Sequence, residues 1–189
     1  MEDQSFILLP SLKESILQQP SWTVLIPTFN CANFLKETLE SVLNQDMGTK
    51  EMEIIVIDDC STKDDPERVV KDIGRVGLSL SGNQKNVGKV RNYETGLLRS
   101  KGRFIHQLHG DDKVRPGFYI MMEELFRLHP DAMAGFCRSL YVDENNKWKQ
   151  LSGIEKYEGG ILDNWFEKWC YPNAFRHHRW LLRGKYMKP

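Results

Sequence analysis

Short apolar runs alternate along the chain with segments of helical periodicity. The apolar runs predict strands at residues 22–27, 53–59, 76–82 and 103–112. Apolar residues at helical spacing, such as Leu35, Leu39 and Val42, predict helices within residues 34–47, 61–74, 86–102 and 115–130. This regular alternation predicts an α/β fold: a mostly parallel, Rossmann-like sheet with right-handed crossovers and helices on both faces.

Two of these elements carry signals about burial and boundaries. The run EIIVID has four consecutive apolar residues, so we expect a strand that is covered on both faces, as parallel strands are. In the segment that follows, Ser61 and Asp64 stand at the spacing of a capping box, and Gly74 is a typical helix stop.

Polar clusters follow three of the predicted strands, as PTFN at 27–30, DDCS at 58–61 and HGDD at 109–112. In a parallel sheet the carboxyl ends of the strands share one edge, where ligands of such sheets bind. Three polar clusters at one edge are more than solubility requires. The sequence therefore predicts a ligand site there.

Composition narrows the class of ligand and partner. The 189 residues suit one ordinary domain, and 26 acidic residues balance 26 basic ones, so no overall field attracts nucleic acid. Four widely spaced cysteines indicate a reducing compartment. No apolar run is long enough for a transmembrane segment. We expect a cytoplasmic protein, free or peripheral at the inner face of the membrane.

The first cluster suits a nucleobase. Pro27 fixes the backbone, Phe29 offers an aromatic ring, and Thr28 and Asn30 offer hydrogen bonds. The structural alternative is an ordinary strand-to-helix turn with Phe29 in the core.

The second cluster, Asp58 and Asp59, can accept from a base N–H or a ribose hydroxyl, although one of the two acids could cap the next helix. In NVGKVRN, Gly88 and Asn92 accompany Arg91 at a helix start, where backbone N–H groups and a fixed cation suit phosphate oxygens. A solvated basic turn is the alternative for that segment.

The adjacent acids Asp111 and Asp112 each raise the cost of ionising the other. A divalent cation removes that repulsion. Mg²⁺ or Mn²⁺ takes one or two carboxylates together with phosphate oxygens and water, and it neutralises a diphosphate leaving group. An acidic turn ahead of Pro116 is the alternative, but the neighbouring clusters favour the metal.

Together, four segments resemble the family 2 glycosyltransferases, which have the GT-A fold. They are VLIPTFNCANFLKETLESVLNQ, EIIVIDDCSTKDD, NVGKVRNYETGLLRSKGRFI and LHGDD, and the resemblance covers roughly residues 22–136. It implies an inverting transfer of sugar from a nucleotide-diphosphate donor, with a UDP-sugar favoured, to an acceptor hydroxyl with the help of a divalent metal. The acceptor, whether glycan, lipid or protein, is left open.

The resemblance also assigns roles by position. Pro27, Phe29 and Asp59 would contact the base, with Asp58 beside them and Arg91 near the base or diphosphate. Asp111 would face the ribose and the metal, and Asp112 would be a metal ligand. The family often writes the last motif as D-x-D-D, whereas this chain has His109 in place of the first acid.

The C-terminal part departs from the family pattern. The resemblance implies a general base in a late acidic pair, and neither Glu155 nor Glu158, nor Asp163 or Glu167, is a convincing candidate. From residue 168 the tail is basic and aromatic, which suggests a shifted reading frame or a natural basic tail. We expect an N-terminal extension at 1–21, a nucleotide-sugar-binding domain at 22–140 and an incomplete acceptor-side segment at 141–189.

Three other functions are weighed against transfer. A donor-binding pseudoenzyme or inactive fragment is the main alternative, because the donor motifs are present and the base is not evident. A receiver domain would carry its acidic pair after the first strand, not the second. A dinucleotide-dependent oxidoreductase would require G-x-G-x-x-G after the first strand, which this sequence lacks.

Overall fold

The computed structural model describes residues 19–162 and 181–183. The chain divides into two compact units, Met1–Phe118 with Leu182–Pro189, and Tyr119–Leu181. The division into an extension, a donor domain and an acceptor segment stays a prediction.

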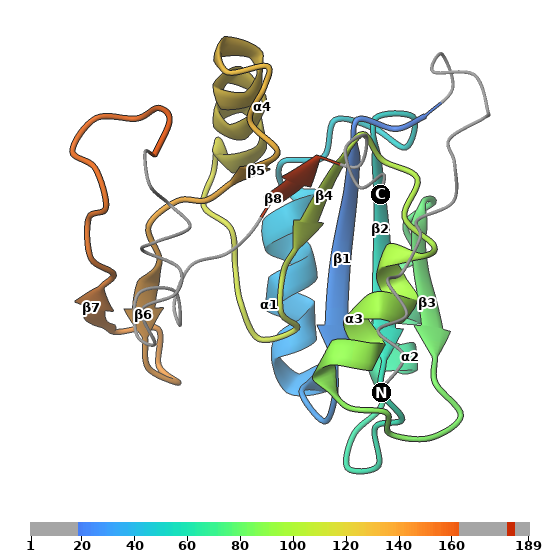
Figure 1. Ribbon diagram of the computed structural model, residues 1–189. Helices are drawn as coiled ribbons and strands as arrows, with labels where there is room; N and C mark the ends of the chain where they lie inside the picture. The colour runs from blue at the N-terminus through green and yellow to red at the C-terminus, as the bar shows by residue number, and fades with distance from the viewer. Residues whose placement is uncertain (1–18, 163–180, 184–189) are drawn as a thin grey trace, which may run out of the picture. The chain divides into compact units, whose positions relative to one another are not determined.

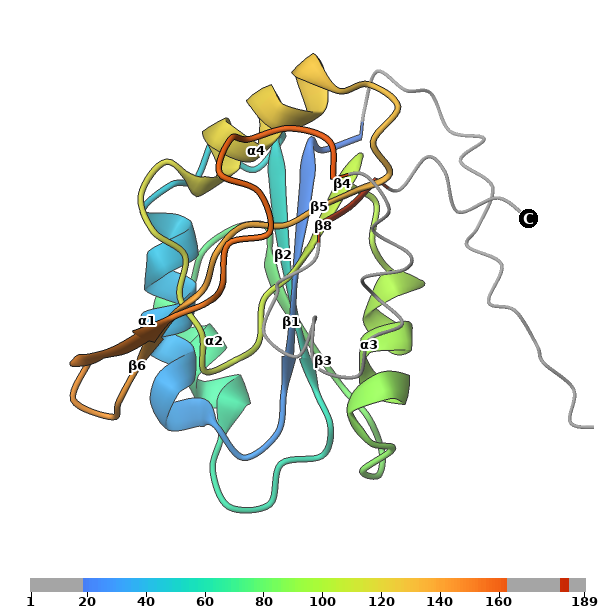
Figure 2. The ribbon, with the colours of Figure 1, turned by 60° about the vertical axis from the view of Figure 1, so that its left-hand side comes forward.

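The first unit contains a parallel sheet with helices on both faces. Its strands are β1 (Trp22–Thr28), β2 (Met52–Asp58), β3 (Leu78–Gly82) and β4 (Phe104–Gln107), in the order β3-β2-β1-β4. Each neighbouring pair is parallel (Figure 1). Helices α1 (Ala32–Leu43) and α2 (Pro66–Ile73) lie on one face and α3 (Lys89–Leu97) on the other (Figure 2). The predicted α/β fold is confirmed.

Strands β1 and β2 form the centre of the core, as their unbroken apolar runs predict. Leu25 and Ile57 are fully buried and pack with Ile55 against Tyr93 and Leu97, two residues of α3. Alternate residues of the same strands are buried on the opposite face. Because apolar side chains cover both faces of these strands, the polar clusters that follow the strands lie at the carboxyl edge of the sheet.

A glycine sets the distance between α3 and the sheet. A Cβ at Gly96 would fall 2.1 Å from Cδ1 of Leu25, so the helix can approach β1 this closely only where it has no side chain.

The start of α2 differs from the prediction. The helix begins at Pro66, and its N-cap is Asp65, whose carboxylate accepts from the Arg68 N–H at 2.9 Å. Pro66 supports this start because proline has no N–H to leave unsatisfied at the first turn. Gly74 ends the helix with φ 61°, as predicted.

The predicted capping box of Ser61 and Asp64 is therefore wrong. Ser61 donates from both its N–H and its hydroxyl to Asp58. Asp64 accepts at 2.7 Å from the N–H of Ala32, the first residue of α1. Both side chains bond to groups outside their own helix, so the spacing on which the prediction relied is coincidental.

The second unit holds the remaining elements. They are α4 (Phe118–Leu128), β5 (Ala134–Gly135), the antiparallel pair β6 (Leu140–Val142) and β7 (Trp148–Leu151), and β8 (Leu181–Arg183). The first residue of α4 is the last residue of the first unit, and β8 has its first residue in the second unit and the rest in the first. Within residues 19–162 and 181–183, no helix has the length and apolar character needed to cross a membrane.

Candidate nucleotide-sugar site

The carboxyl ends of the strands are joined by backbone hydrogen bonds between the polar clusters. The N–H of Asp59 donates to the Thr28 carbonyl at 3.0 Å, and the N–H of Asn83 donates to the Asp58 carbonyl at 2.9 Å. The N–H of Gly110 donates to the Pro27 carbonyl at 3.2 Å. The structure thus brings the clusters that follow β1, β2, β3 and β4 to one edge.

The turn after β1 presents one aromatic ring and fixes one amide. The Phe29 side chain is 46% exposed, so the alternative that places it in the core does not hold. Asn30 has φ 51° and accepts through Oδ1 from the N–H groups of Thr62 and Lys63, at 2.9 and 3.0 Å. Asn30 therefore ties the β1–α1 turn to the β2–α2 loop, while Phe29 stays accessible to a ligand.

Asp59 is buried and its carboxylate bonds to the loop that precedes α3. The side chain is 3% exposed. Oδ1 accepts from the Asn83 amide at 3.0 Å and from the Val87 N–H at 2.8 Å, and Oδ2 accepts from the Gly88 N–H at 2.9 Å. The carboxylate thus holds residues 83–88 against the end of β2.

Asn92 extends the same buried network. Its amide donates to the Ile57 carbonyl at 2.9 Å, and its Oδ1 accepts from the Asn83 side chain at 2.9 Å. With 2% exposure, Asn92 connects α3 to β2, and the sequence had grouped it only with possible ligand contacts. The partner Asn83 was missed because nothing in its local sequence distinguishes it from an ordinary loop asparagine.

The start of α3 presents a cation to solvent. Gly88 is the N-cap residue with φ 84°, a conformation that favours glycine. The Arg91 side chain is 70% exposed, and its guanidinium donates to the Glu94 carboxylate at 3.1 Å. An exposed pair of this kind contributes little stability, so the guanidinium is available to exchange Glu94 for a phosphate.

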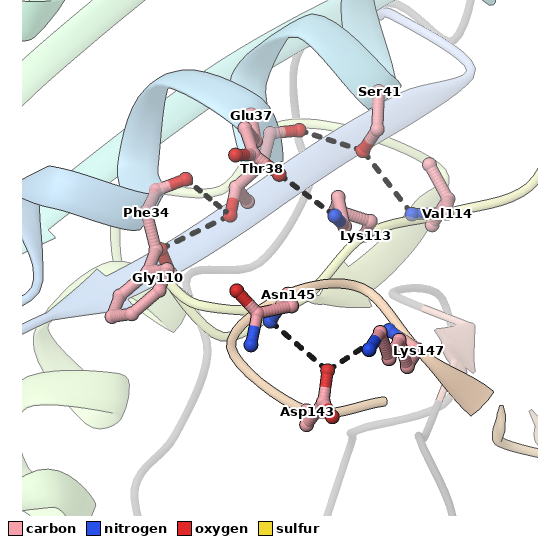
Figure 3. A network of polar contacts seen from close by, with 10 residues as sticks. All are labelled: Phe34, Glu37, Thr38, Ser41, Gly110, Lys113, Val114, Asp143, Asn145 and Lys147. Atoms are coloured by element: carbon pink, nitrogen blue, oxygen red, sulfur yellow. Dashed lines mark hydrogen bonds and ion pairs between the residues drawn. The ribbon is translucent and has the colours of Figure 1, made fainter. Parts of the chain in front are cut away.

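The acidic turn after β4 is held by hydrogen bonds to β1 and α1, and Figure 3 shows those to α1. Asp111 is exposed and Asp112 is half-buried. A Cβ at Gly110 would lie 2.9 Å from Cys31 Sγ and 3.0 Å from Thr28 Oγ1, so this position accepts glycine alone without displacing its neighbours. The Thr38 hydroxyl donates to the Gly110 carbonyl at 3.0 Å.

Later carboxylates are placed only in part. Glu155 is half-buried and Glu158 exposed in the second unit, whereas Asp163 and Glu167 lie outside the described residues. Among residues 19–162 and 181–183, no group of three or more His, Cys, Asp and Glu side chains could hold a metal. A cation at the acidic turn would therefore need oxygen ligands from a bound molecule or water as well.

The mostly parallel sheet with helices on both faces matches the GT-A glycosyltransferase fold of the solved structures to which this chain is similar. The chain belongs to glycosyl transferase family 2, whose model matches residues 23–186. The match extends past residue 168, and the tail lies largely outside the described residues, so a shifted reading frame stays a prediction.

Named relatives match part of the chain. The GalNAc(5)-diNAcBac-PP-undecaprenol beta-1,3-glucosyltransferase of Campylobacter jejuni is 34% identical over 71% of this chain and 43% of its own length. The poly(ribitol-phosphate) beta-N-acetylglucosaminyltransferase TarS of Staphylococcus aureus is 32% identical over 49% of this chain and 16% of its own. The chain thus spans less than half the length of these relatives.

Solved structures share the fold. The crystal structure of S. aureus TarS with UDP-GlcNAc aligns with a TM-score of 0.57 and 22% identity, over 69% of this chain and 37% of that one. A mannosyltransferase from Pyrobaculum calidifontis, in complex with GDP-Man and Mn²⁺, aligns with a TM-score of 0.55 and 23% identity, over 61% of this chain and 34% of that one.

Proposed function

We propose that this chain binds a nucleotide-diphosphate sugar at the carboxyl edge of its sheet and transfers the sugar to an acceptor hydroxyl. The observation that carries the proposal is that backbone hydrogen bonds join the three polar clusters and the end of β3 at this edge. Membership of glycosyl transferase family 2 supports the reaction class. The uridine nucleotide in the TarS complex supports a UDP-sugar as the favoured donor.

Different accessible groups would contact different parts of the nucleotide-sugar donor. The exposed Phe29 ring suits the face of a base, and Pro27 and Asp59 would complete the contacts with the base. The Arg91 guanidinium and the N–H groups at the start of α3 suit diphosphate oxygens. Asp111 would face the ribose and the cation. Thr28, Asn30 and Asn92 would shape the site through their contacts with protein rather than bind the donor directly.

A divalent cation fits the acidic turn. Asp111 is exposed beside Asp112 on a turn with a fixed backbone, and two carboxylates are the protein ligands that Mg²⁺ or Mn²⁺ usually takes beside phosphate oxygens. When bound, such an ion neutralises charge on the diphosphate leaving group. The Mn²⁺ present in the Pyrobaculum mannosyltransferase complex supports this choice of metal class.

Inversion at the anomeric carbon would require a carboxylate that takes the proton of the acceptor hydroxyl. Asp143, which follows β6, is poorly suited to that role. Its carboxylate accepts from the N–H groups of Asn145 and Lys147, at 3.0 and 2.9 Å (Figure 3). It also lies 2.9 Å from Nζ of Lys149. The hydrogen bond from Lys149 is the main cause that lowers the pKa of Asp143. A carboxylate stabilised in its charged form is a weak base.

Donor binding without transfer is therefore the second candidate function. Asp143 is engaged in a turn, Glu155 and Glu158 were not convincing candidates from the sequence, and Asp163 and Glu167 lie outside the described residues. The two functions share the donor site and differ in turnover.

Calorimetry of the full chain with UDP or GDP, each with and without MnCl₂, tests donor binding. We expect UDP to bind more tightly with Mn²⁺, and Asp111→Asn to remove the dependence on metal. Asp72→Asn, which alters an exposed acid of α2, is the control and should bind as the wild type does. Absence of nucleotide binding by the wild type would refute the proposal.

A radiolabelled UDP-sugar assay that measures both hydrolysis and transfer then separates the two functions. Release of UDP well above the rate of the Asp111→Asn variant would favour transfer. Binding without release would favour the second candidate.

A further inference from the structure

Three polar side chains in and just after α1 bond to the backbone of residues 110–118. Thr38 and Ser41 stand three positions apart in α1, so they share one side of the helix. Gln45 lies two residues beyond the last residue of α1. We call these three side chains together the polar face of α1. All three lie in the first segment of the family resemblance, but none is among the residues predicted to contact the donor or the cation.

Each of the three side chains contacts a different backbone group. The Thr38 hydroxyl donates to the Gly110 carbonyl at 3.0 Å, in a buried hydrogen bond. Ser41 Oγ accepts from the Val114 N–H at 3.1 Å (Figure 3), and Gln45 Oε1 accepts from the Phe118 N–H at 2.9 Å. The three contacts fix the segment before, after and well beyond Asp111 and Asp112.

The polar face is itself oriented by the helix. Ser41 donates its hydroxyl proton to the Thr38 carbonyl at 2.7 Å, and the Gln45 amide donates to the Ser41 carbonyl at 3.0 Å. With their donors engaged by α1, the oxygens of these two side chains are directed at the N–H groups of the segment. Their geometry is therefore set before any ligand binds.

α1 also contacts this segment through an exposed ion pair. Lys113 and Glu37 form an ion pair of 2.7 Å, with side-chain exposures of 36% and 53%. Ion pairs exposed to this extent are screened by water and salt. The hydrogen bonds of the polar face are neutral and include the buried bond of Thr38, so salt screens them less than it screens this ion pair.

We infer that Thr38, Ser41 and Gln45 are positioning residues for the divalent cation. They hold the Asp111–Asp112 turn in one place, so that its carboxylates are arranged for the ion in advance. This inference rests on the proposed function, because it assigns the purpose of the turn to metal binding. Groups that orient the ligands of a metal typically change its affinity by about 10- to 100-fold when they are removed.

The test compares Thr38→Val, Thr38→Ser and Ser41→Ala with the wild type in the full chain. Thr38→Val keeps the shape of the side chain and removes the donor, whereas Thr38→Ser keeps the donor. Ser100→Ala is the control for Ser41→Ala, since Ser100 also donates to a carbonyl of its own helix, that of Gly96 at 3.0 Å. Two readouts are measured: Mn²⁺ affinity in the presence of UDP, by electron paramagnetic resonance, and amide hydrogen exchange of residues 108–115 in metal-free protein.

We expect Thr38→Val and Ser41→Ala to weaken Mn²⁺ binding by about 10-fold and to speed exchange in residues 108–115. Thr38→Ser should restore both, and Ser100→Ala should change neither. If the wild type binds Mn²⁺ and Thr38→Val binds it equally well, the inference is overturned while the proposed function stands. If the wild type binds no Mn²⁺, the metal part of the proposed function fails and the cation role of the polar face fails with it. Unchanged exchange in the variants would show that α1 does not hold the turn.

Discussion

The substitution Asp59→Asn tests whether the buried carboxylate holds the loop before α3. It preserves the size of the side chain and replaces one accepting oxygen with an NH₂ group. In the wild type, both carboxylate oxygens accept hydrogen bonds, from the Asn83 amide and from the N–H groups of Val87 and Gly88. Backbone N–H groups can only donate. The NH₂ group of an asparagine at this position must therefore face at least one N–H group that can only donate, and no hydrogen bond can form there.

The smallest cost arises when the new NH₂ group faces Gly88. The oxygen then keeps the bonds from Asn83 and Val87, and the charged partner of the Gly88 N–H is lost. A hydrogen bond to a charged group contributes about 1.5–3 kcal/mol. The Asn86 side chain, which accepts from the Gly88 N–H at 3.2 Å, remains as a longer partner. We therefore expect a loss near the lower end, about 2 kcal/mol of unfolding free energy.

Urea unfolding of ligand-free protein, followed by tryptophan fluorescence, measures this loss. For a typical urea dependence the midpoint should fall by about 1 M. Asp58→Asn is the matched control, because the Ser61 hydroxyl that donates to Asp58 can accept instead from the new amide. A midpoint for Asp59→Asn equal to that of Asp58→Asn would refute the reasoning. The ligand-free measurement also separates this role from any contact of Asp59 with a base.

Two further predictions concern stability. Gly96→Ala places a Cβ against Leu25 and should lower the unfolding free energy by about 1–3 kcal/mol, whereas Gly153→Ala, which has open space around it, should have little effect in the same urea titration. Burial raises the pKa of Tyr93 from 10.0 to about 12. Its phenol ionises first in the unfolded chain, so stability should be lost as pH rises from about 10 to about 12, and Tyr93→Phe should reduce that loss. Equal declines in the urea midpoints of wild type and Tyr93→Phe between pH 9 and pH 11.5 would contradict the second prediction.

The fold could be predicted because its signals are local. Four consecutive apolar residues at the end of Met52–Asp58 identify a strand buried on both faces, and Gly74 marks the end of the next helix. The alternation of such elements implies a parallel sheet, and the parallel sheet places the ends of its strands at one edge. That edge is where the structure joins the predicted polar clusters.

The roles of individual polar side chains could not be predicted in the same way. From the sequence, Asp59 and Asn92 were predicted to contact a ligand. The structure adds that both side chains are buried and form hydrogen bonds with other segments. Asp64 was predicted to cap its own helix, whereas its partner is Ala32, 32 positions away. Spacing along the chain indicates a partner only when that partner lies within a turn or two.

The sequence by itself determined the elements, their parallel order and the edge where a donor would bind, because hydrophobic periodicity and helix stops act over a few residues. The tertiary structure alone decided which polar side chains are exposed at that edge and which are buried in hydrogen bonds between segments. Thr38 illustrates the reason: its hydroxyl bonds to a carbonyl 72 positions away, beside the acidic turn. Such a partner is chosen by the packing of α1 against the sheet, and no local pattern encodes it.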